Sequence, residues 1–455
     1  MSQFSDLVIL VPGIMGSALA VGDKEVWAPN ASALWTFVKS GASSLEVLHT
    51  GHPQSKLVRA TRLMPDATLV PGLFKIDGYT KAAETLRQKL ALLDGQNYRE
   101  FPYDWRLDNR INAQALGEST LEWLDHWRAS SGNPDAKVSF VCHSMGGLVA
   151  RHFTDVLEGW KVTRRLVTIG TPHRGSLNAL RFIEHGMKKG IGPLGIDLSP
   201  ILRSLPSLYQ LLPTYACVQG VQGAAVKISD AIDAGAFQHM DRTMAQHAAD
   251  FHATLKAAAE SNLQIAGYAD SFALIPVVGV EQPTSQSALF AAGGLQVVDY
   301  LEGEFYKGDG TVPRPSAIPH GLEKSHRASY FAEAHGSLQN NPAVLSHVCS
   351  VLSADLIDFG RFMRASDADD LSVALDDVVL PGDPLVITAK SDSFLPRVEV
   401  QLVNLGNGET HDEVLSRSGD EYRGAYNLSA GTWRVTVSSP KTGAVTDLAV
   451  VAAEA

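Results

Sequence analysis

Cysteine is scarce in this sequence. The 455-residue chain contains three cysteines, Cys142, Cys217 and Cys349, which are odd in number and far apart. They form no CxxC pair and no cluster with histidine at the spacing of a zinc site. We therefore expect a reducing compartment and no metal site, and nothing else in the sequence points to a cofactor.

Long hydrophobic runs are also lacking. No uninterrupted apolar stretch is long enough to form a membrane-spanning helix. Leu7–Val11 already has the composition of a core strand, which leaves no room for the basic start and apolar segment of a secretory signal. We therefore expect a cytoplasmic protein, although export by a signal-independent route would leave the same sequence.

Positive charge is in deficit. The chain has 38 lysines and arginines against 49 acidic residues, a net charge of −11. General attraction to nucleic acid or to an anionic lipid surface is therefore disfavoured, although local basic patches remain compatible with this composition. The apolar fraction of 45% and the charged fraction of 19% are typical of a soluble globular protein. The length predicts two domains, and we expect no nucleic-acid partner.

Strands alternate with helices along the first part of the chain. Short apolar stretches predict core strands, and apolar residues at helical spacing predict helices between them. The strands are expected at 7–11, 97–103, 137–142 and 165–169, and the helices at 78–93, 112–128 and 145–157. This alternation predicts parallel strands joined by crossover helices, hence a doubly wound α/β sheet.

The pattern changes twice further along. Between about 180 and 295 the alternation lapses into helical fragments and Gly/Pro breaks, which predicts a helical cap inserted over the sheet. After about residue 365, two-residue alternation at 397–403 and 433–437 is separated by turn residues. An acidic stretch at 366–370 would be the linker. We expect a first domain at 1–365 and an antiparallel, immunoglobulin-like β-sandwich at 371–455.

Ser144 is the candidate nucleophile. It lies in FVCHSMGG (140–147), between a predicted strand and a predicted helix. A nucleophile elbow needs this context, because the serine sits on a tight turn with small residues two before and two after it. Gly146 fits the second position, whereas Cys142 stands where glycine is usual. The competing interpretation is a helix N-cap, and His143 is expected to pack beneath the turn rather than to react.

Two backbone N–H groups are candidates for an oxyanion hole. Acyl transfer passes through a tetrahedral oxyanion, which such donors stabilise. One donor normally follows the nucleophile, which is Met145 here, and the other comes from the loop after an early strand. Ile14, after Pro12-Gly13, is the natural second donor, unless this glycine turn has a purely structural purpose.

Asp309 and His335 complete the predicted triad. In an elbow-type hydrolase the acid and then the histidine follow the serine along the chain. Asp309 lies in GDGTVP (308–313), whose glycines let the loop turn sharply, and His335 lies in AHGSL (334–338). The histidine would take the serine proton, and the carboxylate would orient the imidazole. The rival bases are expected to be packing or solvated residues: His320, His326 and His347.

With these motifs in place, the sequence resembles the lecithin:cholesterol acyltransferase-like group of α/β-hydrolases, which includes phospholipases A and acyltransferases. The matching segments lie in the family's order and span about residues 7–350: VILVPGIMGS (8–17), FPYDWR (101–106), CHSMGG (142–147), TIGTPHRGS (168–176), LPSLYQLLP (205–213), GDGTVP (308–313) and the His335 loop. The resemblance does not reach the C-terminal sandwich.

The resemblance implies an α/β-hydrolase fold for the first domain, with lid and cap insertions. It implies that an acyl chain passes from an ester to Ser144 and then to water or an alcohol, with Ile14 and Met145 as oxyanion donors. It also implies a lid at about 25–65 that contains Trp27 and Trp35. Extracellular members pin this lid with a disulfide. Here no cysteine pair is available there, which leaves open a mobile lid or a different substrate.

Three aromatic residues are candidates for substrate contact: Trp27, Tyr103 and Trp105. Tyr103 and Trp105 fit a pocket wall and a structural Asp104–Arg106 network equally well. The favoured function is a serine acyl-ester hydrolase, lipase-like or phospholipase-like, whose substrate is an acyl ester or phospholipid, met at a membrane or micelle surface. The alternatives are transfer of the acyl group to an alcohol acceptor, or a binding protein whose C-terminal sandwich captures a protein partner.

Overall fold

The computed structural model divides into two compact units, Met1–Phe359 and Gly360–Ala455, and each is described by itself. The structure describes residues 4–28, 41–65, 68–70, 74–76, 78–189, 196–219, 224–291, 294–322, 328–354, 372–375, 378–379, 382–391, 395–404, 407–419, 421–440 and 445–451. Trp35, His326 and the acidic stretch at 366–370 lie outside the described residues.

A six-stranded sheet forms the centre of the first unit, and every pairing within it is parallel. This confirms the predicted parallel sheet. Its strand order is β16-β13-β9-β8-β1-β7. The strands are β1 (Leu7–Val11), β7 (Tyr98–Glu100), β8 (Val138–His143), β9 (Thr163–Ile169), β13 (Ala273–Gly279) and β16 (Ser329–Phe331).

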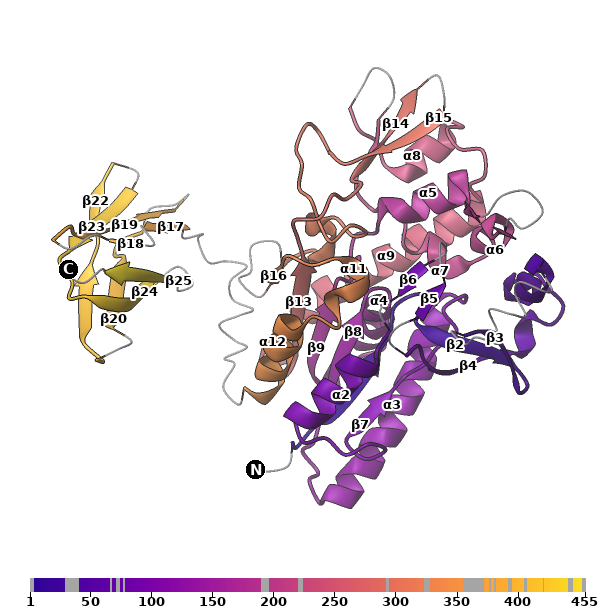
Figure 1. Cartoon of the computed structure of the whole chain (residues 1–455), viewed down its shortest axis with the longest axis horizontal. Coiled ribbons are helices and arrows are strands. Elements are labelled where there is room, and N and C mark those ends of the chain that lie inside the picture. Colours follow the sequence, from indigo (N-terminus) through magenta and orange to yellow (C-terminus); the bar gives the residue numbers. More distant parts are fainter. Residues whose placement is uncertain are drawn as a thin grey trace. The chain divides into compact units, whose positions relative to one another are not determined.

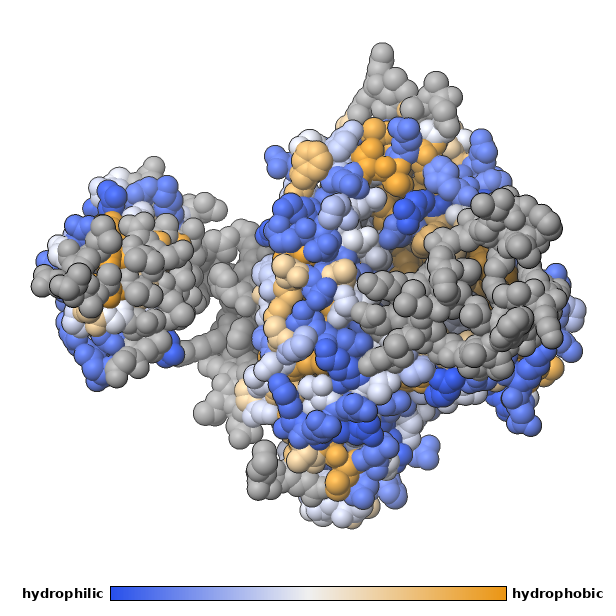
Figure 2. Space-filling model, viewed as in Figure 1, coloured by the Kyte–Doolittle hydropathy of each residue, from blue (hydrophilic) through white to orange (hydrophobic). Residues whose placement is uncertain are grey.

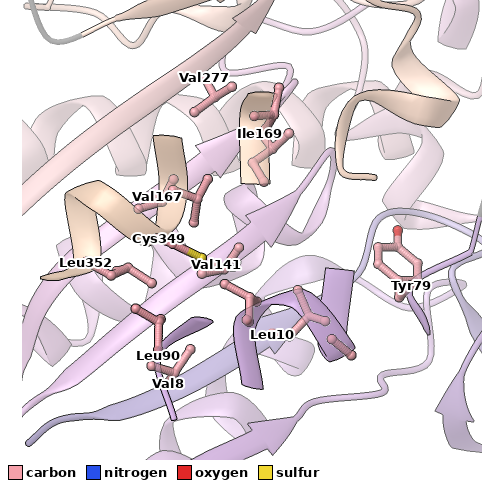
Figure 3. Packing of buried hydrophobic residues seen from close by; sticks show 14 of the residues in the cluster. Val8, Leu10, Tyr79, Leu90, Val141, Val167, Ile169, Val277, Cys349 and Leu352 are labelled. Atoms are coloured by element: carbon pink, nitrogen blue, oxygen red, sulfur yellow. The ribbon is translucent and has the colours of Figure 1, made fainter. Parts of the chain in front are cut away.

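Helices cover both faces of this sheet (Figure 1). Helices α2 (Thr80–Lys89) and α12 (Pro342–Ser353) pack against each other on one face, and α3 (Asn109–Ser131) and α4 (Gly146–Arg151) pack on the other. A π-helical turn at His152–Val156 continues α4. Figure 3 shows the aliphatic core between the sheet and the first pair of helices, with Tyr79 at one end of the labelled side chains.

The chain order of the strands fixes where a site can form. From β1 the chain goes to β7 on one side, and then returns to β8 on the other side of β1. At such a switch point the loops after two neighbouring strands diverge and leave a crevice at their carboxyl ends. Gly13 follows β1 and Ser144 follows β8, so both residues belong to this crevice.

One central strand lies inside the region expected to be a helical cap at 180–295. β13 pairs with β9 through Ala273–Val277, so the helical segment ends before residue 273. Pro276 explains why the sequence pattern did not predict this strand, because proline is rare inside sheets. It is tolerated here because pairing with β16 begins only at Val277, so the missing N–H breaks no ladder bond on that side. The residues just before this strand form turns and the short helix α10 (Tyr268–Ser271).

The rest of the 180–295 region is largely helical. Its helices are α5 (Leu177–His185), α6 (Ser199–Arg203), α7 (Pro206–Tyr209), α8 (Ile228–Asp233) and α9 (Arg242–Asn262). A small sheet accompanies them, in the order β12-β14-β15: β12 (Val218–Gln219), β14 (Ser287–Ala291) and β15 (Gly294–Val298). A short antiparallel pair joins β10 (Lys188–Lys189) to β11 (Ile196–Asp197).

Residues 17–63 add a three-stranded antiparallel sheet beside the central one. It consists of β2 (Ser17–Val21), β3 (Lys24–Trp27) and β4 (Val58–Leu63), with a 3-10 helix at Gly41–Leu48 before β4. A further hairpin joins β5 (Thr68–Val70) to β6 (Phe74–Ile76). The expected lid at about 25–65 overlaps this region.

Arg106 anchors the loop that precedes β4. Its side chain is 1% exposed and pairs with Asp104, with Nη2 2.6 Å from Oδ2. The guanidinium also donates to the carbonyl oxygens of Val47, at 3.1 Å, and Ser55, at 2.9 Å. Thr50 then links the same loop to the cap, because its Oγ1 donates to the carbonyl oxygen of Ser204 at 2.6 Å. The loop is therefore fixed to both the sheet and the cap.

The second unit consists of two β-sheets around one apolar core, which includes the fully buried Trp433. One sheet has the order β17-β19-β23-β22 and is antiparallel, and the other has the order β18-β25-β24-β20-β21. The second sheet departs from the expected pattern at one edge, where β18 runs parallel to β25. The strands are β17 (Ser372–Leu375), β18 (Val378–Val379), β19 (Leu385–Lys390), β20 (Glu399–Asn404), β21 (Thr410–Val414), β22 (Ser416–Ser418), β23 (Glu421–Tyr426), β24 (Gly431–Ser438) and β25 (Val445–Val451).

Among the residues coloured by hydropathy in Figure 2, hydrophilic ones predominate on this face, and hydrophobic ones lie in small groups. Among the described residues, no helix combines the length and the apolar composition needed to cross a membrane.

Replacing Arg106 by Met is expected to lower the free energy of unfolding by about 3–5 kcal/mol, because the change removes the cation that pairs with Asp104 and the donor to the carbonyl oxygens of three residues, Val47, Leu48 and Ser55. The matched control is Arg62→Met, which removes the exposed ion pair between Arg62 and Glu25 and is expected to cost less than about 1 kcal/mol. Denaturant unfolding measures both values, and limited proteolysis reports release of the 47–55 loop. Equal losses in the two variants would contradict the anchoring role of Arg106.

Candidate active site

Ser144 lies on a strained turn between β8 and α4. Its φ is 52°, a left-handed conformation that a residue with a side chain rarely adopts. The turn is held by a hydrogen bond from the Ser144 N–H to the carbonyl oxygen of Ile169, at 2.8 Å. A Cβ atom on Gly146 would lie 2.3 Å from the carbonyl oxygen of Pro12, so only glycine fits where the helix crosses the end of β1. This is the geometry of a nucleophile elbow.

Cys142 replaces the usual glycine within β8. It is fully buried and pairs in register with Val11 on one side and Thr168 on the other. Burial raises the pKa of the Cys142 thiol, so the group stays protonated and apolar in the sheet interior. All three cysteines of the chain are buried and unpaired.

His335 connects Ser144 to Asp309. Its Nε2 lies 2.9 Å from Ser144 Oγ, and its Nδ1 lies 2.7 Å from Asp309 Oδ2. The carboxylate can only accept, so Nδ1 carries the hydrogen, and Nε2 is left to accept the proton of the serine hydroxyl. The three predicted side chains therefore converge, although 191 residues separate Ser144 from His335.

Asp309 is held as a buried carboxylate. It is 2% exposed, and its Oδ1 accepts hydrogen bonds from the N–H groups of Thr311, at 2.9 Å, and Val312, at 2.7 Å. The backbone closes the arrangement, because the N–H of His335 donates to the carbonyl oxygen of Asp309 at 2.8 Å. One carboxylate oxygen is thus fixed by the loop and the other faces the imidazole.

Two glycines that the motif analysis did not single out make room for this pair. Gly170 directly follows β9, and a Cβ there would lie 3.0 Å from Asp309 Oδ2 and 3.1 Å from His335 Nδ1. Gly279 ends β13, and a Cβ there would lie 2.5 Å from Asp309 Cβ. The sequence feature that could have identified these two positions is a glycine at the carboxyl end of β9 and of β13.

The two proposed oxyanion donors lie beside Ser144. Met145 follows it directly, and the loop carrying Ile14 comes so close that a Cβ on Gly13 would lie 2.8 Å from Ser144 Cβ. The next residue, Met15, has a φ of 62°, which bends this loop sharply. Within the described part of the chain, no hydrogen bond occupies the backbone N–H of Ile14 or of Met145. Both groups are therefore available as donors.

The rival histidines take part in other contacts. His347 lies on α12, with Nε2 2.9 Å from Ser329 Oγ and its ring against Phe331. A further histidine outside that set, His173 of the TIGTPHRGS segment, is buried, with Nε2 3.2 Å from Thr168 Oγ1. His320 is exposed. None of these three bonds to Ser144 in the structure.

The aromatic candidates for substrate contact bind the backbone. Tyr103 is 3% exposed and donates from its hydroxyl to the carbonyl oxygen of Pro12 at 3.0 Å. Trp105 is 1% exposed and donates to the carbonyl oxygen of Ser17 at 3.1 Å. The half-buried Trp27 donates to that of Met15 at 3.2 Å and packs edge-on against Trp105. These bonds, with the Asp104–Arg106 pair, form the structural network that the sequence suggested. A role in substrate contact stays a prediction.

No described group of histidine, cysteine, aspartate and glutamate side chains is arranged to hold a metal ion.

By sequence, the chain is similar to lecithin:cholesterol acyltransferases. The family model for lecithin:cholesterol acyltransferase matches residues 74–349. The lecithin-cholesterol acyltransferase-like protein 4 of Arabidopsis thaliana is 22% identical over 404 residues, covering 73% of this chain and 73% of its own.

Two solved structures give weaker matches. One is the mature form of lipase BlEst2 from Bacillus licheniformis, with 12% identity, coverage of 78% of this chain and 94% of the lipase, and a TM-score of 0.37. The other is phospholipase PlaB from Legionella pneumophila, with 10% identity, coverage of 98% and 90%, and a TM-score of 0.35.

Replacing Gly170 by Ala is expected to lower kcat by about ten- to a hundredfold, because the added methyl group displaces the carboxylate and the imidazole. Gly132→Ala is the matched control. Gly132 has a φ of 68°, close to the 58° of Gly170, but nothing lies within 4 Å of its added Cβ. Both variants are expected to lose about 1–2 kcal/mol of stability from backbone strain. A comparable loss of kcat in Gly132→Ala would contradict the steric explanation.

Acidification is expected to destabilise this unit through its buried histidines. Burial lowers the pKa of His143 to about 3, and burial also places the pKa of His173 well below its ordinary value of 6.5. Below pH 6.5 the unfolded chain therefore binds more protons than the folded one, so the free energy of unfolding falls as the pH falls toward 3. The slope is up to about 1.4 kcal/mol per pH unit for each such histidine.

Denaturant unfolding between pH 7 and pH 4 checks this expectation. His143→Gln should flatten the decline, whereas a change at the exposed His239, His239→Gln, should leave it as in the wild type. A pH-independent free energy of unfolding in the wild type would refute it.

Proposed function

The chain belongs to the lecithin:cholesterol acyltransferase family, and from this premise we propose that it is a serine-dependent lipid acyl-ester hydrolase with Ser144 as nucleophile, His335 as base and Asp309 as its orienting acid. The observation that carries the proposal is the hydrogen-bonded series from Asp309 Oδ2 through both ring nitrogens of His335 to Ser144 Oγ. A structural serine at a helix start needs no such series. Helix capping alone therefore does not account for the arrangement.

The acylation step follows from the donors and acceptors at the site. His335 Nε2 takes the hydroxyl proton as Ser144 Oγ attacks the ester carbonyl, and Asp309 stabilises the imidazolium that forms. The carbonyl oxygen becomes an oxyanion that accepts from the N–H groups of Ile14 and Met145, each worth about 2.7–4 kcal/mol in the transition state. His335 then returns the proton to the leaving oxygen, which departs as an alcohol or a lysolipid.

Deacylation decides between hydrolysis and transfer. Water, or an acceptor alcohol, loses its proton to His335 and attacks the acyl carbonyl. The bond between the acyl carbon and Ser144 Oγ then breaks, and His335 returns the proton to Oγ, which restores the serine hydroxyl. We propose water as the default acceptor, and family membership keeps acyl transfer to an alcohol as the second candidate. Product analysis with and without an added long-chain alcohol separates them, because transfer yields a new ester and hydrolysis a free fatty acid.

The substrate proposed is a long-chain acyl ester, including phospholipids. Six apolar cap side chains are buried, which fits either an acyl channel or packing of the cap on the sheet: Ile201, Leu202, Leu205, Leu208, Leu211 and Leu212. We further propose that residues 1–365 form the hydrolase domain and that the accessory domain at 371–455 is immunoglobulin-like. A cytoplasmic location also remains part of this proposal.

Ser144→Ala is expected to abolish labelling by a fluorophosphonate probe and to lower kcat on a lipid ester by roughly a millionfold. Asp309→Asn is expected to lower kcat about ten-thousandfold, because an amide no longer enforces the required imidazole tautomer. Ser139→Ala is the matched control, since Ser139 lies on β8, the strand that leads to Ser144, is fully buried, and its Oγ has no hydrogen-bond partner among the described residues. Labelling retained in Ser144→Ala would exclude this serine as the nucleophile.

A further inference from the structure

Two buried polar side chains beside the triad take no part in the reaction described above. Tyr79 lies just before α2 and is 2% exposed, and His143 ends β8 and is 7% exposed. In Figure 3 the Tyr79 ring lies at one end of the labelled side chains of the aliphatic cluster, and its hydroxyl oxygen is visible there. Packing accounts for the ring of Tyr79. It does not account for the hydroxyl.

The two side chains join three loops around Ser144. The N–H of Gly13 donates to Tyr79 Oη at 2.8 Å, and Tyr79 Oη lies 2.9 Å from His143 Nδ1. His143 Nε2 then lies 3.1 Å from the carbonyl oxygen of His335. The series therefore runs from the loop after β1, past the elbow, to the backbone of the proposed base.

The ends of this series fix the direction of every hydrogen bond in it. A backbone N–H can only donate and a carbonyl oxygen can only accept. His143 Nε2 must therefore carry the hydrogen, which leaves Nδ1 as an acceptor. Tyr79 consequently accepts from Gly13 and donates to His143. Each hydrogen bond in the series therefore has a single direction. The series is complete only with a neutral His143 and a hydroxyl at position 79.

We propose that Tyr79 and His143 are positioning residues, whose hydrogen-bonded bridge holds the oxyanion loop and the base loop in register with Ser144. Ile14 follows the bonded residue Gly13 directly, so the bridge acts on the loop that supplies one oxyanion donor. At its other end the bridge holds the carbonyl group of His335 itself. This inference rests on the proposed function, since it assigns the bridge to the same reaction.

The charge on His143 matters because its ring lies against the base. The ring centroids of His143 and His335 are 5.0 Å apart. During acylation His335 becomes an imidazolium, and a second positive ring at that distance would oppose its formation. Burial and the neighbouring His335 lower the pKa of His143 to about 3, so His143 stays neutral while the base is charged. The bridge and the base therefore have compatible protonation states.

The bridge does not use the oxyanion donor itself. The N–H of Gly13 donates to Tyr79, and the N–H of the next residue, Ile14, stays available for the oxyanion. Loss of the Tyr79 hydroxyl would leave the Gly13 N–H and His143 Nδ1 without partners, while the packing of the ring would persist. Small displacements of reacting groups, on the order of 1 Å, can cost about a hundredfold in rate. The bridge is thus tested by removing one oxygen atom.

The test compares Tyr79→Phe with Tyr98→Phe in the full-length chain, using steady-state hydrolysis of a soluble medium-chain p-nitrophenyl ester. Tyr98 is equally buried and donates one hydrogen bond, to Glu100 at 3.2 Å on β7. Tyr79→Phe is expected to lower kcat by about tenfold or more with KM within about twofold, because the bridge positions reacting groups rather than substrate. Tyr98→Phe is expected to leave both constants unchanged.

A second pair of variants separates positioning from folding. The amide of Gln carries one acceptor and one donor, so His143→Gln can accept from Tyr79 and donate to His335. It is expected to retain kcat within about threefold of the wild type, whereas His143→Leu is expected to lose about tenfold or more. Thermal unfolding of each variant shows how much of any loss reflects unfolded protein.

Three outcomes overturn the proposal: wild-type kcat in Tyr79→Phe, an equal loss of kcat in Tyr98→Phe, or equal kcat in the Gln and Leu variants of His143. Ser144→Ala in the same assay distinguishes failure of the bridge proposal from failure of the proposed function. If Ser144→Ala is inactive and Tyr79→Phe is fully active, only the bridge is refuted. If Ser144→Ala keeps its activity, the proposed function is refuted as well.

Discussion

The left-handed backbone at Ser144 is the constraint on which the site depends. A side chain at φ 52° costs about 1–2 kcal/mol relative to an ordinary turn, so the surroundings must hold it there. The Ser144 N–H does so from one side, by bonding to the end of β9, and Gly146 does so from the other, by letting α4 touch the end of β1. The strain is therefore maintained by the parallel sheet itself, at the point where its strand order changes direction.

The proposed acid and base converge on this turn because the sheet brings distant segments together. β13 and β16 are neighbours, and Asp309 and His335 follow them on separate loops. Gly170 and Gly279 leave the space for this pair, because an added Cβ would meet the Asp309 carboxylate at Gly170 and the Cβ of Asp309 at Gly279. Two backbone N–H groups satisfy one oxygen of Asp309, and the imidazole satisfies the other. The position of this side chain thus comes from backbone geometry more than from charged neighbours.

Much of this was predictable where the information is local in the chain. The strands β1, β8 and β9 have compact apolar sequences, and the serine, acid and histidine motifs occur in the order that an elbow-type hydrolase requires. β13 was missed because Pro276 interrupts its pattern and because the strand follows a long helical insertion. The bridge between Tyr79 and His143 could not be predicted from the sequence either. Tyr79 is 66 positions from Gly13 and 64 from His143, and sequence periodicity does not indicate contacts between such distant residues. The roles of Arg106 escaped for the same reason, because its partners are backbone carbonyls 51 and 59 positions away.

The hydrogen bonds of Arg106 are relevant to the absence of a cysteine pair in the predicted lid. A family resemblance implies a disulfide-pinned lid in extracellular members, and here the 47–55 loop is fixed by a guanidinium to the sheet and by Thr50 to the cap. An arginine stays charged at any pH at which proteins fold and has no redox chemistry, so this anchor does not depend on an oxidising compartment. A disulfide constrains mainly the unfolded chain, whereas Arg106 stabilises only the folded one. The two devices therefore differ in one respect: the buried guanidinium holds the loop only while the Asp104 carboxylate and the surrounding fold are intact, which couples the 47–55 loop to the stability of the first unit.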